Sequence, residues 1–300
     1  MEGLTDSIFR RLHHQFFPGL DGYFTPFLSP TSSQLLTARE MRELPVAESL
    51  AFSVVPQILT KKAEHFLWMA QKCADLGYPE VNLNLGCPSG TVTAKGKGSG
   101  MLRDTDALSH FLDDIFKYSK TDISIKTRIG FDNASEFPKI LEIYNRYPIK
   151  ELTIHPRVRS AFYSGSVDMQ SFSYAIDNAK IPLCYNGDLT SLEQIDSLQK
   201  AYPQLQAVMI GRGLIRNPGM FASEPATAER LQAFYDALLD DYISAFGSSR
   251  NALFRLKEHW GMLIGRFENA QDYAKQLRKT SDISQYKAIT SAIFRECPLK

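Results

Sequence analysis

The chain has 300 residues, of which 44% are hydrophobic and 22% are charged, and these values exclude a disordered or fibrous protein. Lysine plus arginine total 34 and aspartate plus glutamate total 33, so the net charge of +1 excludes a protein that coats nucleic acid by charge alone, although it allows a local basic face. No apolar run approaches the ~20 residues of a membrane span, and the polar N-terminus does not resemble a signal peptide, so we expect a cytoplasmic protein with no membrane partner.

A helix is expected at residues 7–16, and after it short apolar runs alternate with amphipathic stretches. The predicted strands are residues 22–28, 51–58, 80–85, 123–129, 151–155, 181–186 and 207–211. Helices are predicted between most of them, at residues 62–76, 107–119, 136–146, 169–178 and 191–201. Several strands are apolar at consecutive positions, which is typical of a parallel sheet that is covered on both faces. The repeating pattern predicts an α/β fold, a (β/α)8 TIM barrel.

The prediction yields seven strands, whereas a closed barrel of this type has eight. Residues 1–6 have the composition of a loop that follows a strand, so the first barrel strand is expected to be missing or truncated. An open barrel would expose two unpaired strand edges. We therefore expect either a start codon further upstream or another segment that fills the gap.

The pattern changes near residue 228, after which no strand is predicted. Helical periodicity covers residues 228–246, 252–265, 270–278 and 283–294, and Pro218 and Pro225 mark a boundary before it. The predicted organisation is a catalytic barrel domain over residues 1–225 and a small all-helical domain over residues 226–300.

The four cysteines, at positions 73, 87, 184 and 297, form no CxxC pair, so no metal site or dithiol redox motif is expected. Without an export signal they are expected to be free thiols. Cys73 and Cys184 lie in apolar stretches and are predicted to be buried. Cys87 lies instead in the sequence NLGCPS after a predicted strand, before the glycine-rich residues 95–100. Taken alone, Cys87 is equally compatible with a small residue that fills a turn.

Functional groups of such a barrel lie at the carboxyl ends of its strands, and this places the Cys87 loop on the catalytic face. The strand at 123–129 carries Lys126 and Arg128, which point the same way because side chains alternate along a strand. The next strand ends with His155 and Arg157. Several cations in one place need an anionic or electron-rich partner.

The last two predicted strands end in Asn186-Gly187-Asp188 and Gly211-Arg212-Gly213. The loops after strands seven and eight commonly hold a phosphate in this fold. Glycine exposes backbone N–H groups, and the Arg212 guanidinium is a cation that can donate two parallel hydrogen bonds to a phosphate. If the missing strand is counted, these two loops follow strands seven and eight, and a phosphate-bearing ligand is expected there.

Together these residues resemble the tRNA-dihydrouridine synthases. The matching pieces are MEGLTD at 1–6, Gln57, NLGCPS at 84–89, Lys126-Thr127-Arg128, His155, Asn186-Gly187-Asp188 and VMIGRG at 208–213. They occur in the family's order and cover the barrel well. The tail, with RLKEHW at 255–260, is most similar to the bacterial branch that modifies position 16 of the tRNA D-loop. The family has a short strand ending in Ala-Pro before MEG, which is absent here.

The resemblance implies an enzyme that uses FMN, reduced by NADPH, to reduce the C5–C6 bond of a D-loop uridine in tRNA. Cys87 would be the proton donor. The residues implied to bind FMN are Met1, Gln57, Lys126, His155, Asn186, Gly187, Asp188, Gly211 and Arg212. The substrate would be held by Asn84, Arg128 and Arg157, and the tRNA body by the barrel rim and by basic patches of the tail at Arg250, Arg255, Lys257 and 278–279. No protein partner is indicated, and a monomer is expected.

Two other functions are compatible with the sequence. The first is an FMN-dependent barrel reductase that acts on a free pyrimidine or an enone, and parallel reduction of tRNA and of a free nucleoside would separate it from the tRNA enzyme. The second is a non-catalytic tRNA-binding or folding factor, which the flavin spectrum of the purified protein would exclude.

Overall fold

A computed structural model describes all 300 residues, which form two compact units. The sheet unit comprises Gly22–Asp188 and Ile195–Met209, and the helical unit comprises Met1–Asp21, Leu189–Gln194 and Ile210–Lys300. The first 21 residues therefore join the helical unit rather than the sheet. The assignment of a catalytic role to residues 1–225 and of a tRNA-binding role to residues 226–300 stays a prediction.

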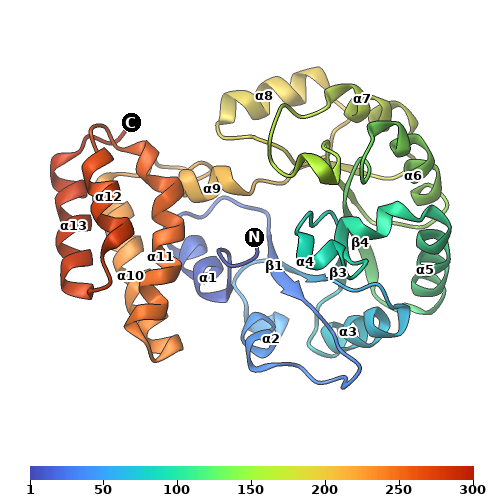
Figure 1. The fold of residues 1–300 in the computed structure, drawn as a ribbon, viewed down its shortest axis with the longest axis horizontal. Helices are drawn as coiled ribbons and strands as arrows, with labels where there is room; N and C mark the ends of the chain where they lie inside the picture. The colour runs from blue at the N-terminus through green and yellow to red at the C-terminus, as the bar shows by residue number, and fades with distance from the viewer. The chain divides into compact units, whose positions relative to one another are not determined.

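The sheet unit is built on seven parallel strands that lie side by side in chain order (Figure 1). They are β1 (Tyr23–Leu28), β2 (Val54–Ile58), β3 (Glu80–Leu85), β4 (Asp122–Arg128), β5 (Leu152–His155), β6 (Leu183–Tyr185) and β7 (Ala207–Val208). This curled parallel sheet confirms the predicted α/β fold of the TIM-barrel type. β1 and β7 form the two edges of the sheet, and no eighth strand pairs with them.

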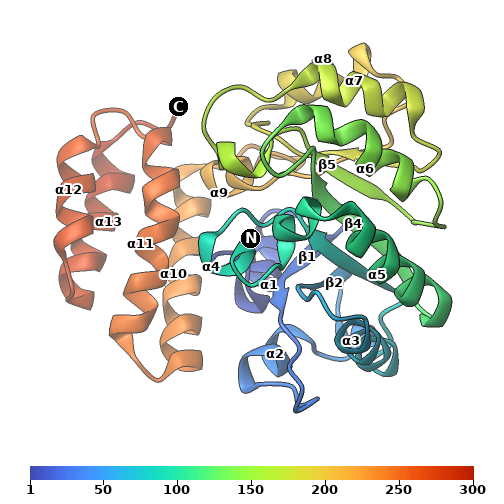
Figure 2. The ribbon, with the colours of Figure 1, turned by 45° about the vertical axis from the view of Figure 1, so that its right-hand side comes forward.

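Helices follow most strands and cover the outer face of the curled sheet (Figure 2). They are α3 (Ala63–Asp75), α5 (Thr105–Tyr118), α6 (Phe137–Tyr144), α7 (Met169–Asn178) and α8 (Leu192–Ala201), of which the first three residues of α8 belong to the helical unit. Their positions agree with the predictions because each has an apolar face that is buried. In α5, for example, the Asp104 carboxylate caps the first turn and Leu108, Phe111, Leu112 and Ile115 are buried.

Several short helices were absent from the predictions. They are α2 (Ala38–Glu43), α4 (Gly90–Thr93), α9 (Arg212–Arg216) and the 3-10 turns η1 (Ala47–Ser49), η2 (Gly98–Arg103), η3 (Ala134–Glu136), η4 (Arg159–Ala161) and η5 (Ile264–Arg266). Segments of one or two turns are too short to show periodicity. Local bonds define them instead, as in α2, where Thr37 and Glu40 form a capping box.

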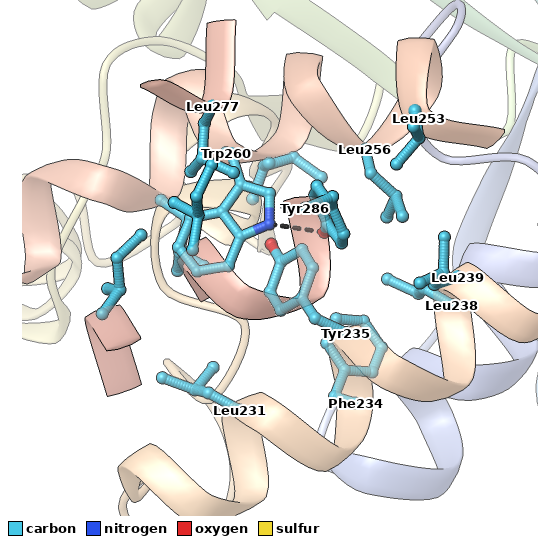
Figure 3. Packing of buried hydrophobic residues seen from close by; sticks show 14 of the residues in the cluster. Leu231, Phe234, Tyr235, Leu238, Leu239, Leu253, Leu256, Trp260, Leu277 and Tyr286 are labelled. Atoms are coloured by element: carbon cyan, nitrogen blue, oxygen red, sulfur yellow. Dashed lines mark hydrogen bonds between the residues drawn. The ribbon is translucent and has the colours of Figure 1, made fainter. Parts of the chain in front are cut away.

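The helical unit contains α1 (Ser7–Phe16), α9, α10 (Ala228–Phe246), α11 (Ser249–Leu263), α12 (Gln271–Lys279) and α13 (Ile283–Glu296). The four predicted tail helices are therefore confirmed. Figure 3 shows their shared apolar core, in which the Trp260 indole N–H donates to the Tyr286 hydroxyl at 2.7 Å. Phe9 of α1 belongs to the same core. None of the helices combines the length and the apolar composition that crossing a bilayer requires.

Two histidines are buried in this helical core. Neither ring nitrogen of His259 has a hydrogen-bond partner, and burial together with the charge of Arg255 lowers its pKa to about 3. The His13 Nε2 lies 2.8 Å from the carbonyl oxygen of Pro218, and burial lowers the pKa of His13 to about 4. Both rings are neutral in the folded protein, whereas the unfolded chain protonates them below pH ~6.5. Their contribution to stability is therefore complete above that pH and is lost as the pH falls toward 4.

We expect the free energy of unfolding to fall by about 2 kcal/mol for each of these two histidines between pH 7 and pH 5. His259→Leu removes one titrating ring and is expected to halve this part of the pH dependence. His110 is exposed, so His110→Gln should leave it unchanged. Urea unfolding at both pH values measures the effect, and a His259→Leu protein with the wild-type pH dependence would contradict the argument.

Candidate active site

Four of the candidate side chains come from two neighbouring pairs of strands. Asn84 of β3 is in register with Lys126 of β4, and Arg128 of β4 is in register with His155 of β5. Because all the strands are parallel, their carboxyl ends lie at the same end of the sheet, and these four residues lie at or near those carboxyl ends. The sheet unit therefore brings together the thiol, amide, imidazole and cationic groups that were predicted at the carboxyl ends of the strands.

Buried amides form a hydrogen-bonded ladder inside the sheet. The Asn84 Nδ2 donates to the Gln57 Oε1 at 2.9 Å, and the Gln57 Nε2 donates to the Asn82 Oδ1 at 3.0 Å. The Asn82 Nδ2 donates to the Ser124 Oγ at 2.9 Å, and that hydroxyl donates to the Glu80 Oε1 at 2.5 Å. The orientations of Gln57 and Asn84 are thus fixed by partners within the protein.

Both backbone polar groups of Cys87, the N–H and the carbonyl, form hydrogen bonds that hold its loop. The Asn84 Oδ1 accepts the backbone N–H of Cys87 at 2.9 Å, and the Ser99 hydroxyl donates to the Cys87 carbonyl at 2.7 Å. Gly98 has a φ of +58°, and a Cβ there would lie 2.9 Å from the Cys87 carbonyl oxygen, so only glycine fits this position. The loop therefore holds Cys87 in one orientation.

Cys87 is also the only cysteine whose side chain is not buried. All four cysteines are free thiols, as predicted, and Cys73, Cys184 and Cys297 are buried. Burial raises the pKa of Cys73 to about 12 and raises that of Cys184 further. A buried thiol with a raised pKa is inert. Only Cys87 can meet a reactant.

Lys126 lies deep in the site. Its Nζ donates to the Asn186 Oδ1 at 2.7 Å, and the Asn186 Nδ2 donates to the carbonyl of Met209 at 2.7 Å. Burial, with the nearby charge of Arg128, lowers the pKa of Lys126 to about 8. The ammonium therefore keeps its proton at neutral pH, and a negatively charged ligand beside it would raise this pKa and be stabilised in turn.

Arg128 binds three backbone carbonyls and is only 1% exposed. Its Nε donates to Gly86 at 3.0 Å, its Nη1 to Val158 at 2.9 Å and its Nη2 to Phe162 at 2.6 Å. The guanidinium thus ties the loop after β3 to the loop after β5. Burial lowers the pKa of Arg128 to about 10, so it stays charged, and the Tyr163 side chain is a further hydrogen-bond partner of its guanidinium.

Arg157 also holds loops together. Its Nη1 donates to the His155 Nε2 at 3.0 Å, and its Nη2 donates to the carbonyl of Gly165 at 2.5 Å and forms an ion pair with Asp188. Because arginine can only donate, the His155 Nε2 accepts and the ring proton lies on Nδ1. Arg157 is only 3% exposed, so its guanidinium is placed to orient His155 and Asp188.

The turn after β6 contains Gly187, where there is little space for a side chain. A Cβ on Gly187 would lie 3.0 Å from the Val167 Cγ1 and 3.1 Å from the Tyr185 hydroxyl, which leaves little room for a larger residue. Asp188 follows with a φ of +48°. Asn186 and Asp188 are therefore presented to Lys126 and Arg157 by a turn that favours a small residue at position 187.

The sequence interpretation missed Tyr163. Its ring stacks on His155, with centroids 6.2 Å apart, and lies 5.4 Å from the Arg128 guanidinium carbon. The Tyr163 side chain is 54% exposed. The signal was an aromatic pair, Phe162-Tyr163, between a strand end and Gly165, but only the fold brings the tyrosine back over the site.

Met1, Gly211 and Arg212 belong to the helical unit. The Met1 sulfur would lie 3.3 Å from a Cβ on Gly211, so these two residues are neighbours there, and Arg212 begins α9 directly after Gly211. A Cβ on Gly213 would overlap the Leu189 carbonyl at 2.2 Å, which requires glycine at that position. The remaining ten candidate residues lie in the sheet unit. No cluster of three His, Cys, Asp or Glu side chains is arranged to hold a metal ion.

Comparison with known proteins finds relatives that are tRNA-dihydrouridine synthases. A probable tRNA-dihydrouridine synthase of Rickettsia bellii is 25% identical over 295 residues, which cover 94% of this chain and 89% of that protein. The tRNA-dihydrouridine synthase B of Pasteurella multocida is 30% identical over 225 residues, or 74% of this chain and 66% of its own.

A solved structure of a morphinone reductase mutant with tetrahydroNAD matches with a TM-score of 0.51 at 9% identity, over 73% of this chain and 81% of that chain, which shows likeness of fold alone. The family model described as dihydrouridine synthase (Dus) matches residues 1–296. With a match over nearly its whole length, the chain belongs to the dihydrouridine synthase family.

Proposed function

We propose that the protein is a tRNA-dihydrouridine synthase that reduces the C5–C6 bond of a D-loop uridine, with FMN as its cofactor and NADPH as reductant. The observation that carries the proposal is the accessible thiol of Cys87, fixed at the end of β3 and near enough to Lys126 to influence its pKa. Position 16 is the proposed target, because the tail resembles the branch that modifies it. The proposed setting is the cytoplasm, where free thiols stay reduced.

The donors of the site fit a flavin mononucleotide. After its bond to Asn186, the Lys126 ammonium has two further N–H groups, and its lowered pKa favours an anionic partner. Gln57, His155 and the turn at 186–188 would contact the flavin ring. Backbone N–H groups at Gly211, with the Arg212 guanidinium, would hold the phosphate. When bound, reduced FMN supplies the hydride that the C6 atom of the uracil takes up.

Hydride addition at C6 leaves negative charge at C5 and on the C4 carbonyl, so an acid must protonate C5. The Cys87 Sγ–H is the proposed acid. Asn84 has one N–H left after its bond to Gln57, and this group, together with the Arg128 guanidinium, would hold the uracil carbonyls. Arg157 would contribute to binding indirectly, by orienting His155 and Asp188.

Replacement of Cys87 by alanine tests the proposed acid. We expect Cys87→Ala to keep FMN and to be reduced by NADPH at the wild-type rate, but to form dihydrouridine about 10² to 10⁴ times more slowly, since a general acid typically contributes that factor. Dihydrouridine formation in tRNA and flavin bleaching are measured separately. Free uridine serves as the control substrate, and an unchanged rate on tRNA would refute the assignment of Cys87.

Replacement of Arg212 tests the phosphate site. A charge-assisted hydrogen bond is worth about 1.5–3 kcal/mol, so Arg212→Ala is expected to weaken FMN binding ten- to hundredfold. Arg216 is exposed on the same short helix, and Arg216→Ala is the matched control. Flavin titration into the apoprotein measures both. Equal affinity in the two variants would place the phosphate elsewhere.

The helical unit is the proposed support for the tRNA body, and one of its cavities is a candidate contact. A cavity of about 200 Å³ lies between α11 and α12, lined by Lys257, Trp260, Gly261, Ile264, Ala274, Leu277 and Arg278. No carboxylate lines it, and neither of its two cations forms an ion pair within the protein. Trp260 is only 2% exposed, so the two cations, rather than its ring, would contact the RNA, through a phosphate. The target base must also leave its stack to be reduced, and this costs little for a nucleotide in a loop, which suits a D-loop target.

The double variant Lys257→Ala/Arg278→Ala is expected to bind tRNA less tightly and to make the plot of log affinity against log salt shallower by about 1.5 to 2. Reduction of the flavin by NADPH should be unaffected. Lys275 of α12 is already paired with Asp272 at 2.9 Å, so Lys275→Ala is the control. A salt dependence that is identical in all three proteins would remove this face from the RNA interface.

A further inference from the structure

We propose that Lys61, Lys95 and Lys97 form a phosphate-binding site beside Cys87 that takes a backbone phosphate of the substrate RNA. The proposal rests on the proposed function, because it takes tRNA to be the substrate. These residues come from two loops of the sheet unit. Lys61 follows β2, and the other two lie in the loop after β3.

The Lys61 side chain reaches the backbone at Gly96, which separates Lys95 from Lys97 in the sequence. This glycine has a φ of +67°, and a Cβ built on it would lie 3.4 Å from the Lys61 Cδ and 3.5 Å from the Lys61 Nζ. The Lys61 ammonium therefore lies against the backbone between Lys95 and Lys97. Burial and the charges of Lys95 and Lys61 lower the pKa of Lys97, in keeping with three close cations.

The cluster has no compensating negative charge. None of the three ammonium groups forms an ion pair or donates a hydrogen bond within the protein, whereas the adjacent Lys62 pairs with Glu64 at 3.6 Å. Like charges held together repel one another, and an anion relieves this repulsion. An ammonium is a compact charge with three donors, which suits a phosphate oxygen.

The position of the cluster favours an RNA phosphate over the 2′-phosphate of NADPH. Lys97 directly precedes Gly98, which packs against Cys87, and the Ser99 N–H donates to the Cys87 carbonyl at 3.1 Å. A phosphate bound here is therefore close to the thiol that would protonate the target base. The phosphates on either side of the target nucleotide meet this requirement, whereas the 2′-phosphate of NADPH is at the far end of that molecule from its nicotinamide.

The test uses the full-length holoprotein and a tRNA transcript. In the triple variant Lys61→Gln, Lys95→Gln and Lys97→Gln, we expect tRNA affinity at low salt to fall by about tenfold or more, and the slope of log affinity against log salt to become shallower by about 2 to 3. The matched control Lys62→Gln should stay close to the wild type. The corresponding triple lysine-to-arginine variant keeps the charges and should recover most of the binding.

The rates of flavin reduction by NADPH and by NADH are measured in the same proteins, and the ratio of these two rates should not change. Wild-type tRNA affinity and slope in the triple glutamine variant would overturn the proposal, as would an equal loss in Lys62→Gln. A fall in the NADPH to NADH ratio with unchanged tRNA binding would also overturn it and assign the lysines to the dinucleotide. Failure of the proposed function is a separate result, because it would appear as a wild-type protein that forms no dihydrouridine.

Discussion

A line of hydrogen bonds runs through the interior of the sheet unit from the start of β3 to the loop beyond its end. It passes from Glu80 through Ser124, Asn82 and Gln57 to Asn84. Barrel interiors of this type are usually filled by branched apolar side chains. A buried amide that loses its partner costs about 1–3 kcal/mol, so each member of the ladder fixes the next. The last oxygen, on Asn84, accepts the backbone N–H of Cys87, and the position of the thiol thus depends on the whole ladder.

The loops above the sheet are held by charges rather than by apolar packing. Arg128 and Arg157 are nearly fully buried, and both bond to backbone carbonyls of the loop after β5. Burying a guanidinium is costly unless its donors are used, which makes any other arrangement of these loops unfavourable. The charge of Arg128 also lowers the pKa of Lys126. The same residues that order the loops therefore make the site electropositive, as a reaction that develops negative charge requires.

The strands and long helices could be predicted because burial on both faces and amphipathic periodicity are written into single segments of the sequence. The carboxyl-end rule predicted that Asn84, Lys126 and His155 lie at the same end of the parallel strands, and the register of β3, β4 and β5 places them there. What could not be predicted depends on pairs that are distant in sequence. The bonds from Arg128 to the carbonyls of Val158 and Phe162 are of this kind, and so is the return of Tyr163 over His155. The membership of α1 in the helical unit is another such case, since its apolar face gives no sign of its partner.

The net charge of +1 conceals an uneven distribution of charge. Some exposed cations are matched by carboxylates, as Lys150 is by Glu80 and Asp122. The lysines around Gly96 are not, and Lys126 is bonded only to a neutral amide. Such local charge acts over a Debye length of about 8 Å at physiological salt, so it cannot draw in a polyanion from far away. The proposed tRNA substrate would therefore be selected by its shape, and the uncompensated cations would act on phosphates that this shape has already brought near.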